Sequence, residues 1–302
     1  MLRSLVLPRV VVSEFPRAPT SDALCCSHTV TVSTYGLRLL IRTNDPVAAA
    51  RFSDLLPPLA RTTGAATWNQ SFTIRNAGRC QCRVKHSEVD TWIGQRFLQS
   101  YDSLSFDLAF DRLGLVIKHY VALYAHGRAF VHAGAVAWQG RGIVIPGRSM
   151  AGKSTLVDAL ARLGAVYYSD EYAVIDSRGR LHPFPQPLAM RTSASGLTQS
   201  DRDPIAEGFE VGTTAIPIGL VVSTAYKAIS RWKPRSMTRG ETVLELLDNC
   251  VAAQHAPHRV IAAITAATGS TDGVKGNRGD APAAAARILE LADSSKKNVA
   301  RR

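Results

Sequence analysis

The chain has 302 residues, of which 46% are hydrophobic and 20% are charged, a composition typical of a folded globular protein rather than a disordered one. Its net charge of +12 is compatible with an anionic partner, but the basic residues are dispersed and form no long run. We therefore expect an acidic substrate or a nucleotide as the partner, and no specific nucleic acid.

The cysteines and the apolar segments indicate the cellular compartment of the protein. An odd number of cysteines, with Cys80 and Cys82 one residue apart, matches neither a disulfide framework nor a zinc site. No apolar stretch reaches the length of a membrane span, and Pro8 and Arg9 interrupt the apolar start before a signal peptide forms. These features predict a cytoplasmic protein without membrane contact.

The amino-terminal part predicts a smaller β-rich subdomain over residues 28–102, after a loosely attached lead-in at 1–27. Alternating and β-branched runs mark its strands. They are expected at residues 28–35 with a continuation at 37–41, at 70–75 and at 82–85.

Apolar residues at helical spacing predict a helix over residues 105–124, within a connecting segment at 103–127. An α/β domain then follows at 128–292, with a flexible tail at 293–302. This domain is expected to open with a hairpin of residues 129–137 and 141–145. Its later strands are expected at residues 165–171, 172–176, 216–223 and 260–264, and its later helices at 242–253, behind a capping box, and at 281–291.

The most specific pattern is G-x-x-x-x-G-K-S, which runs from Gly147 to Ser154. The glycines let backbone N–H groups surround a phosphate, Lys153 can reach the β- and γ-phosphates, and the Ser154 hydroxyl can join a Mg²⁺ shell. An apolar strand precedes the loop and a helix follows it, the arrangement that places an anion at a helix N-terminus. The pattern predicts ATP and Mg²⁺ as cofactors. The expected nucleotide-binding residues are Gly147, Arg148, Ser149, Met150, Ala151, Gly152, Lys153, Ser154 and Thr155.

Two acidic residues, Asp170 and Glu171, follow the loop by the length of one helix and one strand. In a βαβ-like unit this spacing returns them to the phosphates, where a carboxylate can accept the proton of an attacking hydroxyl or hold Mg²⁺. Alternatively, they simply face solvent at a strand end. His132 lies in an apolar strand, where a lone histidine is more often structural than catalytic.

Together these motifs resemble the HPr kinase/phosphorylase family. His132-Ala-Gly, the phosphate loop and Ser169-Asp170-Glu171 occur there in the same order and at similar spacings, and the resemblance covers residues 128–192. Residues 35–38 also resemble the start of HPr-kinase-related proteins of peptide-modifying clusters, among them the lasso-peptide precursor kinases. The implied fold is an α/β phosphate-loop kinase core like the HPr kinase carboxyl-terminal domain, with a smaller β-rich subdomain.

The resemblance also implies residue roles. Asp170 would be the base that takes the proton of a serine hydroxyl, His132 would position or polarise it, and Lys153 would neutralise the phosphates. Ser154, Asp170 and Glu171 would be the metal ligands. Glu171 stands where the family has a second aspartate, and a proline-containing segment replaces the family's glycine-rich signature, which argues against HPr itself as substrate.

Three functions follow as hypotheses. The first is a serine kinase of a peptide or small protein, such as a lasso-peptide-type precursor; the second is a small-metabolite kinase; the third is a non-catalytic ATP-sensing module. Homo-oligomers are common in the resembling family.

Three further features have two interpretations or a plain structural one. Arg148 and Arg191 could clamp phosphates or simply face solvent, and Trp232 could stack on a base or pack in the core. Residues 278–280 are expected to form a turn before the last helix.

Overall fold

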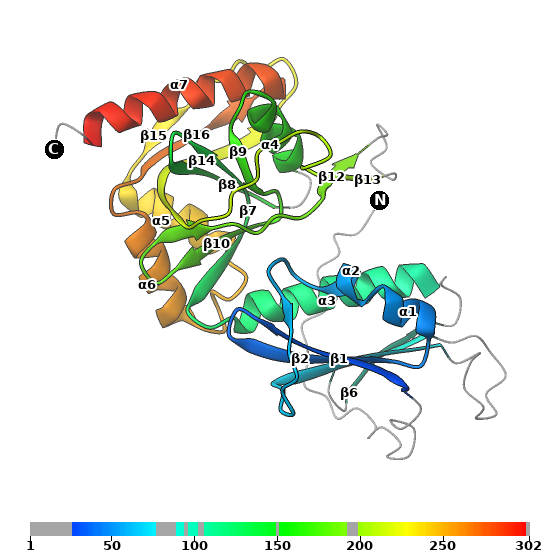
Figure 1. Ribbon diagram of the computed structural model, residues 1–302. Coiled ribbons are helices and arrows are strands. Elements are labelled where there is room, and N and C mark those ends of the chain that lie inside the picture. The colour runs from blue at the N-terminus through cyan, green and yellow to red at the C-terminus, as the bar shows by residue number, and fades with distance from the viewer. Residues whose placement is uncertain are drawn as a thin grey trace. The chain divides into compact units, whose positions relative to one another are not determined.

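The computed structural model describes residues 26–76, 89–93, 96–101, 106–148, 151–191 and 199–299. The chain divides into two compact units (Figure 1). One comprises residues up to Leu56 together with Arg61–Lys118, and the other comprises Pro57–Ala60 and the chain from His119 onward. The strand predicted at residues 82–85 lies outside the described residues.

The first unit is built on a mixed sheet in the order β3-β1-β2-β4-β5-β6. Its strands are β1 (His28–Thr34), β2 (Leu37–Thr43), β3 (Arg61–Thr62), β4 (Gln70–Asn76), β5 (Val89–Ile93) and β6 (Arg96–Tyr101). The sequence predicts that residues 37–41 continue the first strand. In the structure, β2 instead returns antiparallel to β1. The reason is the two-residue turn at Tyr35 and Gly36, whose φ angles of 47° and 80° are those of a tight hairpin.

Three helices accompany this sheet: α1 (Pro46–Ala50), α2 (Phe52–Leu55) and α3 (Phe106–Tyr124). Asp45 caps α1 by accepting a hydrogen bond from the Val47 backbone N–H. Arg51 pairs with Asp107 and lies over the ring of Phe110 on α3. α3 is therefore packed into the first unit over its amino-terminal part, and the boundary between the units falls after Lys118, within the helix.

The second unit contains a larger sheet in the order β11-β10-β7-β8-β14-β16-β15, with β9 paired to β7. The strands β8, β14 and β16 run parallel, as in nucleotide-binding α/β domains, while β7 is antiparallel to β8. The strands are β7 (Arg128–Trp138), β8 (Arg141–Pro146), β9 (Val166–Ser169), β10 (Tyr172–Asp176), β11 (Arg180–His182), β14 (Ile216–Tyr226), β15 (Arg235–Met237) and β16 (Asp272–Arg278).

Helices cover both faces of this sheet (Figure 1). α4 (Lys153–Arg162) and α7 (Ala281–Val299) share one apolar core with Ile143 and Ile145 of β8, and α5 (Arg239–Asp248) and α6 (Pro257–Ala267) share another with Val144. The alternation along β8 is that of a strand buried on both faces. The result is a three-layer α/β/α sandwich.

Three predictions for the last third of the chain differ from the structure. Residues 260–264 belong to helix α6, not to a strand; Pro257 begins the helix, and Val260, Ala263, Ile264 and Ala267 are buried at helical spacing. The last strand is instead the polar segment β16. α5 ends at Asp248 instead of continuing to residue 253, and α7 extends through Val299 into the segment expected to be a tail.

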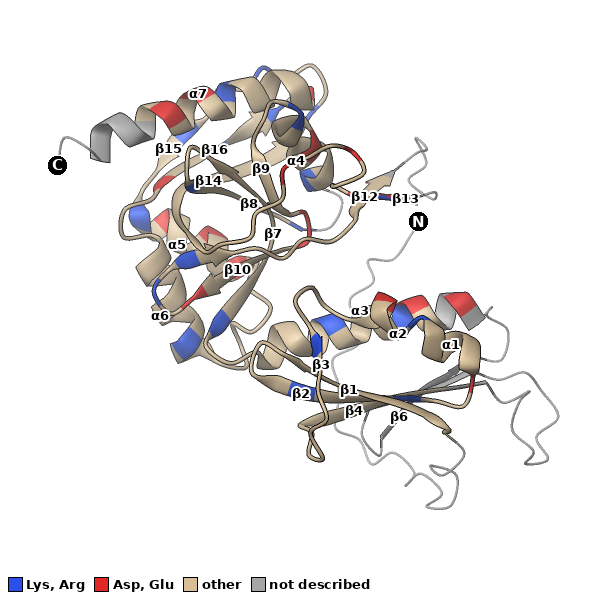
Figure 2. Cartoon of the chain, in the orientation of Figure 1, with Lys and Arg blue, Asp and Glu red and all other residues tan. Residues whose placement is uncertain are grey.

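The capping box that opens α5 is confirmed, because Thr238 and Glu241 each accept the other's backbone N–H. Both α5 and α7 carry side chains of both signs (Figure 2). None of the helices in the described part of the chain is long and apolar enough to cross a membrane.

Candidate active site

The candidate site lies at one edge of the second unit's sheet, where the carboxyl ends of β8 and β9 meet. β7 pairs antiparallel with both strands, so that β8 and β9 run in the same direction on either side of it. β8 leads into the predicted phosphate loop (residues 147–154) and α4, and β9 ends at Ser169, directly before Asp170 and Glu171. Asp170 therefore lies beside the loop, where its carboxylate accepts a hydrogen bond from Ser154, and β7 lies between the two strands.

Lys153 is the first residue of α4, and its side chain turns back into the loop. Its Nζ donates hydrogen bonds to the carbonyl oxygens of Gly147 and Arg148, at 2.8 and 2.9 Å. Burial lowers the pKa of Lys153 to about 8, against the opposing effect of the Asp170 and Glu171 carboxylates. The ammonium is thus held within the loop by neutral acceptors that a phosphate can replace.

Asp170 is buried and hydrogen-bonded on both carboxylate oxygens. Oδ2 accepts from Ser154 Oγ at 2.9 Å and from the Ala189 backbone N–H at 3.1 Å, and Oδ1 lies 3.3 Å from the Tyr167 hydroxyl. Burial raises the pKa of Asp170, while these hydrogen bonds partly oppose the rise. A carboxylate with a raised pKa beside a phosphate loop suits a general base.

Tyr167 and Ala189 support Asp170, and the sequence analysis did not single out either of them. The Tyr167 hydroxyl also contacts the Gln186 carbonyl at 2.8 Å, and the side chain is fully buried. Ala189 lies in β12 (Leu188–Arg191), which pairs with β13 (Gln199–Arg202) as a two-stranded sheet. A single amide contact from this strand to a carboxylate leaves no pattern in the sequence.

His132 projects from β7 toward Lys153. Its Nδ1 lies 2.9 Å from the Glu171 carbonyl oxygen, and its Nε2 lies 3.5 Å from Lys153 Nζ. Burial and then the Lys153 charge lower the pKa of His132, so that the neutral ring is favoured, with Nδ1–H donating to Glu171 and Nε2 facing the ammonium. Among the described residues no hydrogen bond joins His132 to Asp170, so the polarising role that the resemblance implies stays a prediction.

The turn that carries the acidic pair is held by Ser169. Its hydroxyl accepts hydrogen bonds from the backbone N–H groups of Glu171 and Tyr172, and the residue is fully buried. This fixes the direction in which the Asp170 side chain leaves the strand. Glu171 is half-buried, and its charge acts on Lys153.

The remaining predicted loop residues fall into two groups. Gly147, Arg148, Ala151, Gly152 and Thr155 are described, and Gly152 has a φ of 79°, which the loop's turn into α4 requires. Ser149 and Met150 lie outside the described residues, as does the side chain of Arg191. Arg148 and Thr155 are exposed, whereas Trp232 is buried in the core beside α7 and is not a surface for stacking.

The donor set fits a Mg²⁺ ion, which usually takes one or two carboxylates, hydroxyls and waters, and completes its shell with phosphate oxygens. Ser154 Oγ and Asp170 Oδ2 are adjacent oxygen donors at the position where the loop meets β9. Among the described residues there is no cluster of three or more His, Cys, Asp or Glu that would form a metal site without a phosphate. Ser154, Asp170 and Glu171 therefore remain the proposed ligands.

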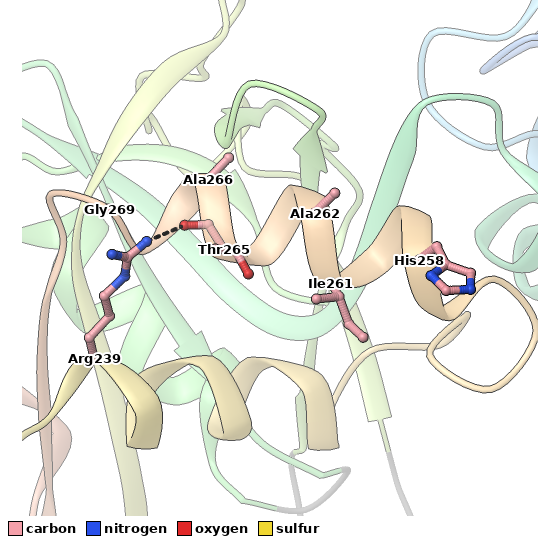
Figure 3. Close-up of a pocket in the computed structure, with 7 residues that line it drawn as sticks. All are labelled: Arg239, His258, Ile261, Ala262, Thr265, Ala266 and Gly269. Carbon is pink, nitrogen blue, oxygen red and sulfur yellow. Dashed lines mark hydrogen bonds between the residues drawn. The ribbon is translucent and has the colours of Figure 1, made fainter.

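A separate hollow of about 560 Å³ lies along α6 (Figure 3). It is lined by Arg239, His258, Ile261, Ala262, Thr265, Ala266 and Gly269. Arg239 reaches across it to the Thr265 carbonyl oxygen at 3.1 Å, so the one arginine on its rim is engaged with the helix itself. No described residue of the predicted phosphate loop lines this hollow.

Comparison of the chain with protein-family models gives no match, and comparison with curated proteins gives none either. Among solved structures, the chain is similar to one titled "Structure of the Hpr(Ser) kinase/phosphatase from Coxiella burnetii". The identity is 16% and the TM-score 0.34, and the match covers 56% of this chain and 97% of that chain. The likeness is remote, so the chemistry of the site must be read from the chain's own residues.

Proposed function

We propose that this protein is an ATP- and Mg²⁺-dependent kinase that transfers the γ-phosphoryl group to a serine hydroxyl of a peptide or small protein. The observation that carries the proposal is the hydrogen bond from Ser154 to Asp170 beside the loop-bound ammonium of Lys153. It places a hydroxyl, a buried carboxylate and a cation at one sheet edge. Phosphoryl transfer needs these groups and little covalent chemistry from the protein.

Each residue has a definite part in this chemistry. Lys153 exchanges its carbonyl acceptors for the β- and γ-phosphates. Asp170 takes the proton of the acceptor hydroxyl. The hydroxyl oxygen bonds to the γ-phosphorus while the bond between the γ-phosphorus and the β,γ-bridging oxygen breaks, so that ADP leaves. Ser154, Asp170 and Glu171 would hold a magnesium ion, which would neutralise phosphate charge.

A peptide acceptor is supported by the surroundings of Asp170. The strand β12 donates its Ala189 N–H directly to the Asp170 carboxylate, and it belongs to a two-stranded arm instead of the main sheet. An extended chain beside this arm would pass close to the proposed base. The finer proposal is a lasso-peptide-type precursor as the natural acceptor, on the basis of the sequence resemblance. A small-metabolite kinase and an ATP-sensing module are the alternatives.

The test is intact-mass spectrometry of short peptides encoded beside this gene, incubated with the protein, Mg²⁺ and ATP. A gain of one phosphate mass, absent with Asp170→Asn, supports the peptide kinase and identifies its acceptor. ATP consumption without any phosphorylated peptide points to a metabolite acceptor. Nucleotide binding without turnover points to a sensor, and the absence of nucleotide binding overturns the proposal altogether.

A further inference from the structure

Arg278, the last residue of β16, reaches the phosphate loop from the neighbouring part of the sheet. Its Nη2 donates to the Gly152 carbonyl oxygen at 2.8 Å, and its Nη1 donates to the Gly279 carbonyl at 3.0 Å. The residue is only 2% exposed, and its Nε has no hydrogen-bond partner. The sequence gives no sign of this contact, because Arg278 and Gly152 are 126 positions apart.

The charge of Arg278 lacks a direct counter-charge. In the described ranges no carboxylate forms an ion pair with it, and the guanidinium lies 5.7 Å from the ring centroid of Tyr226. Asp280 acts on it only through space, and burial lowers the pKa of Arg278. A buried cation without a paired anion is costly, and such groups are normally paired.

The position of this charge makes it more unusual. Gly152 is the N-cap residue of α4, so the guanidinium lies at the positive end of the helix dipole, where a cation is unfavourable. The ammonium of Lys153, the next residue, points into the same loop. Two buried cations thus donate to carbonyl oxygens of the same segment, residues 147–153, next to a helix N-terminus, and an anion with several charges bound there would be attracted by both.

A purely structural role explains less. The Gly152 carbonyl already accepts the Leu156 backbone N–H at 3.2 Å, as the first hydrogen bond of α4, so it does not need Arg278 to be satisfied. The fit at this point is close, because a Cβ on Gly152 would come within 2.5 Å of Arg278 Nη2. Both observations describe a guanidinium placed against the loop itself.

We propose that Arg278 is a positioning residue of the nucleotide site, which holds the Gly152 peptide and adds a second buried positive charge for binding the phosphates. This rests on the proposed nucleotide site but not on the identity of the acceptor. Arg278 acts through Gly152 and through its charge, and has no part in proton transfer. The anion it serves is a nucleoside di- or triphosphate.

The test compares Arg278→Met and Arg278→Lys with Arg141→Met as the matched control. Arg141 also donates to backbone carbonyls, at Ser270 and Ile218, and also has an Nε without a partner, but it begins β8 at the end away from the loop. The Kd values of MgATP, MgADP and AMP are measured by calorimetry at several salt concentrations. Melting temperatures are recorded for each variant.

We expect Arg278→Met to weaken MgATP binding by about tenfold or more, the order of one unit-charge interaction in a partly screened interior. The loss should be smaller for AMP, and the salt dependence of Kd should be shallower than in the wild type. Arg278→Lys keeps the charge and should lose only about threefold, with the salt dependence preserved. Arg141→Met should bind all three nucleotides like the wild type, whatever its effect on the melting temperature.

Equal binding of MgATP by Arg278→Met and the wild type overturns the inference while leaving the nucleotide site intact. The same holds if the loss is equal for MgATP and AMP, since the charge would then not be the cause. If Arg278→Met does not fold, the test relies on Arg278→Lys. A tenfold loss of MgATP affinity in this variant, despite its retained charge, also counts against the inference. Absence of nucleotide binding by the wild type overturns the proposed function itself.

Discussion

The hydroxyl of Ser154 donates to Oδ2 of Asp170 over 2.9 Å and so joins the first turn of α4 to the end of β9. The two residues come from different strand–loop segments on either side of β7. Their contact brings the phosphate loop and the acidic turn into one site. The catalytic assignments depend on this contact.

Asp170→Asn tests the proposed base. The amide keeps the shape of the carboxylate: its oxygen can accept from Ser154 and Ala189, and its NH₂ can face the Tyr167 hydroxyl. We expect kcat for phosphoryl transfer to fall by about 10²- to 10⁴-fold, a much larger effect than the rise in the Kd of MgATP that follows from the loss of one proposed metal ligand. Steady-state kinetics and calorimetry measure the two, and an unchanged kcat would show that another group takes the proton.

Tyr167→Phe tests how the environment of Asp170 sets its pKa. The hydrogen bond from Tyr167 lowers the pKa of Asp170, so its removal should raise that pKa further and shift the acid limb of the pH–rate profile upward. Since a base works only when deprotonated, activity at low pH should decrease. The variant should also lose about 1 kcal/mol of stability, because the contact with the Gln186 carbonyl is removed.

Tyr168→Phe is the matched control for this change. The Tyr168 hydroxyl also donates to a backbone carbonyl, that of Thr214 at 2.9 Å, but within the described part of the chain it forms no hydrogen bond with Asp170. A similar loss of stability without a shifted acid limb is the expected result. If both variants move the limb equally, the effect comes from the general loss of packing.

Nucleotide affinity should fall as the pH rises through about 8, the pKa to which burial lowers Lys153. Below this pH the ammonium is charged and can bind phosphate. Above it the free protein has lost the proton, which binding must then take up, so the Kd should rise by up to about tenfold per pH unit. Calorimetry from pH 6.5 to 9.5 measures it; Lys153→Arg, which stays charged, should show no such rise.

Gly179→Ala tests the turn between β10 and β11. Gly179 has a φ of 75°, and a Cβ there would come within 2.3 Å of the Ala267 backbone N at the end of α6. We expect the substitution to lower the free energy of unfolding by more than about 3 kcal/mol, from left-handed strain together with a backbone clash. Chemical denaturation measures the change.

Gly208→Ala separates the two causes. Gly208 has a φ of 79°, but nothing lies within 4 Å of its Cβ position. Its loss should be limited to the strain, about 1–2 kcal/mol. Equal decreases in the free energy of unfolding for the two variants would mean that α6 can shift to accommodate the added methyl group, so that the close approach at Gly179 costs little.

Much of the site could be predicted because its signals are local. The phosphate loop, the helix after it, the hairpin of β7 and β8 and the capping box of α5 each depend on residues that are near one another in the chain. The wrong strand prediction near the end of the chain concerns segments whose structure depends on distant partners. The polar strand β16 is held by β14 and β15, and the apolar run of α6 reads as a strand until its burial at helical spacing is known.

From the sequence alone one can identify the G-x-x-x-x-G-K-S pattern between a strand and a helix, with an acidic pair one helix and one strand later. The glycines, the lysine and the turn of α4 act through their immediate neighbours, so their spacing alone encodes them. The contacts of Tyr167 and Ala189 with Asp170, and of Arg278 with Gly152, are visible only in the folded chain. Packing brings these residues together from separate parts of the chain, and the spacing of residues in the sequence does not indicate such contacts.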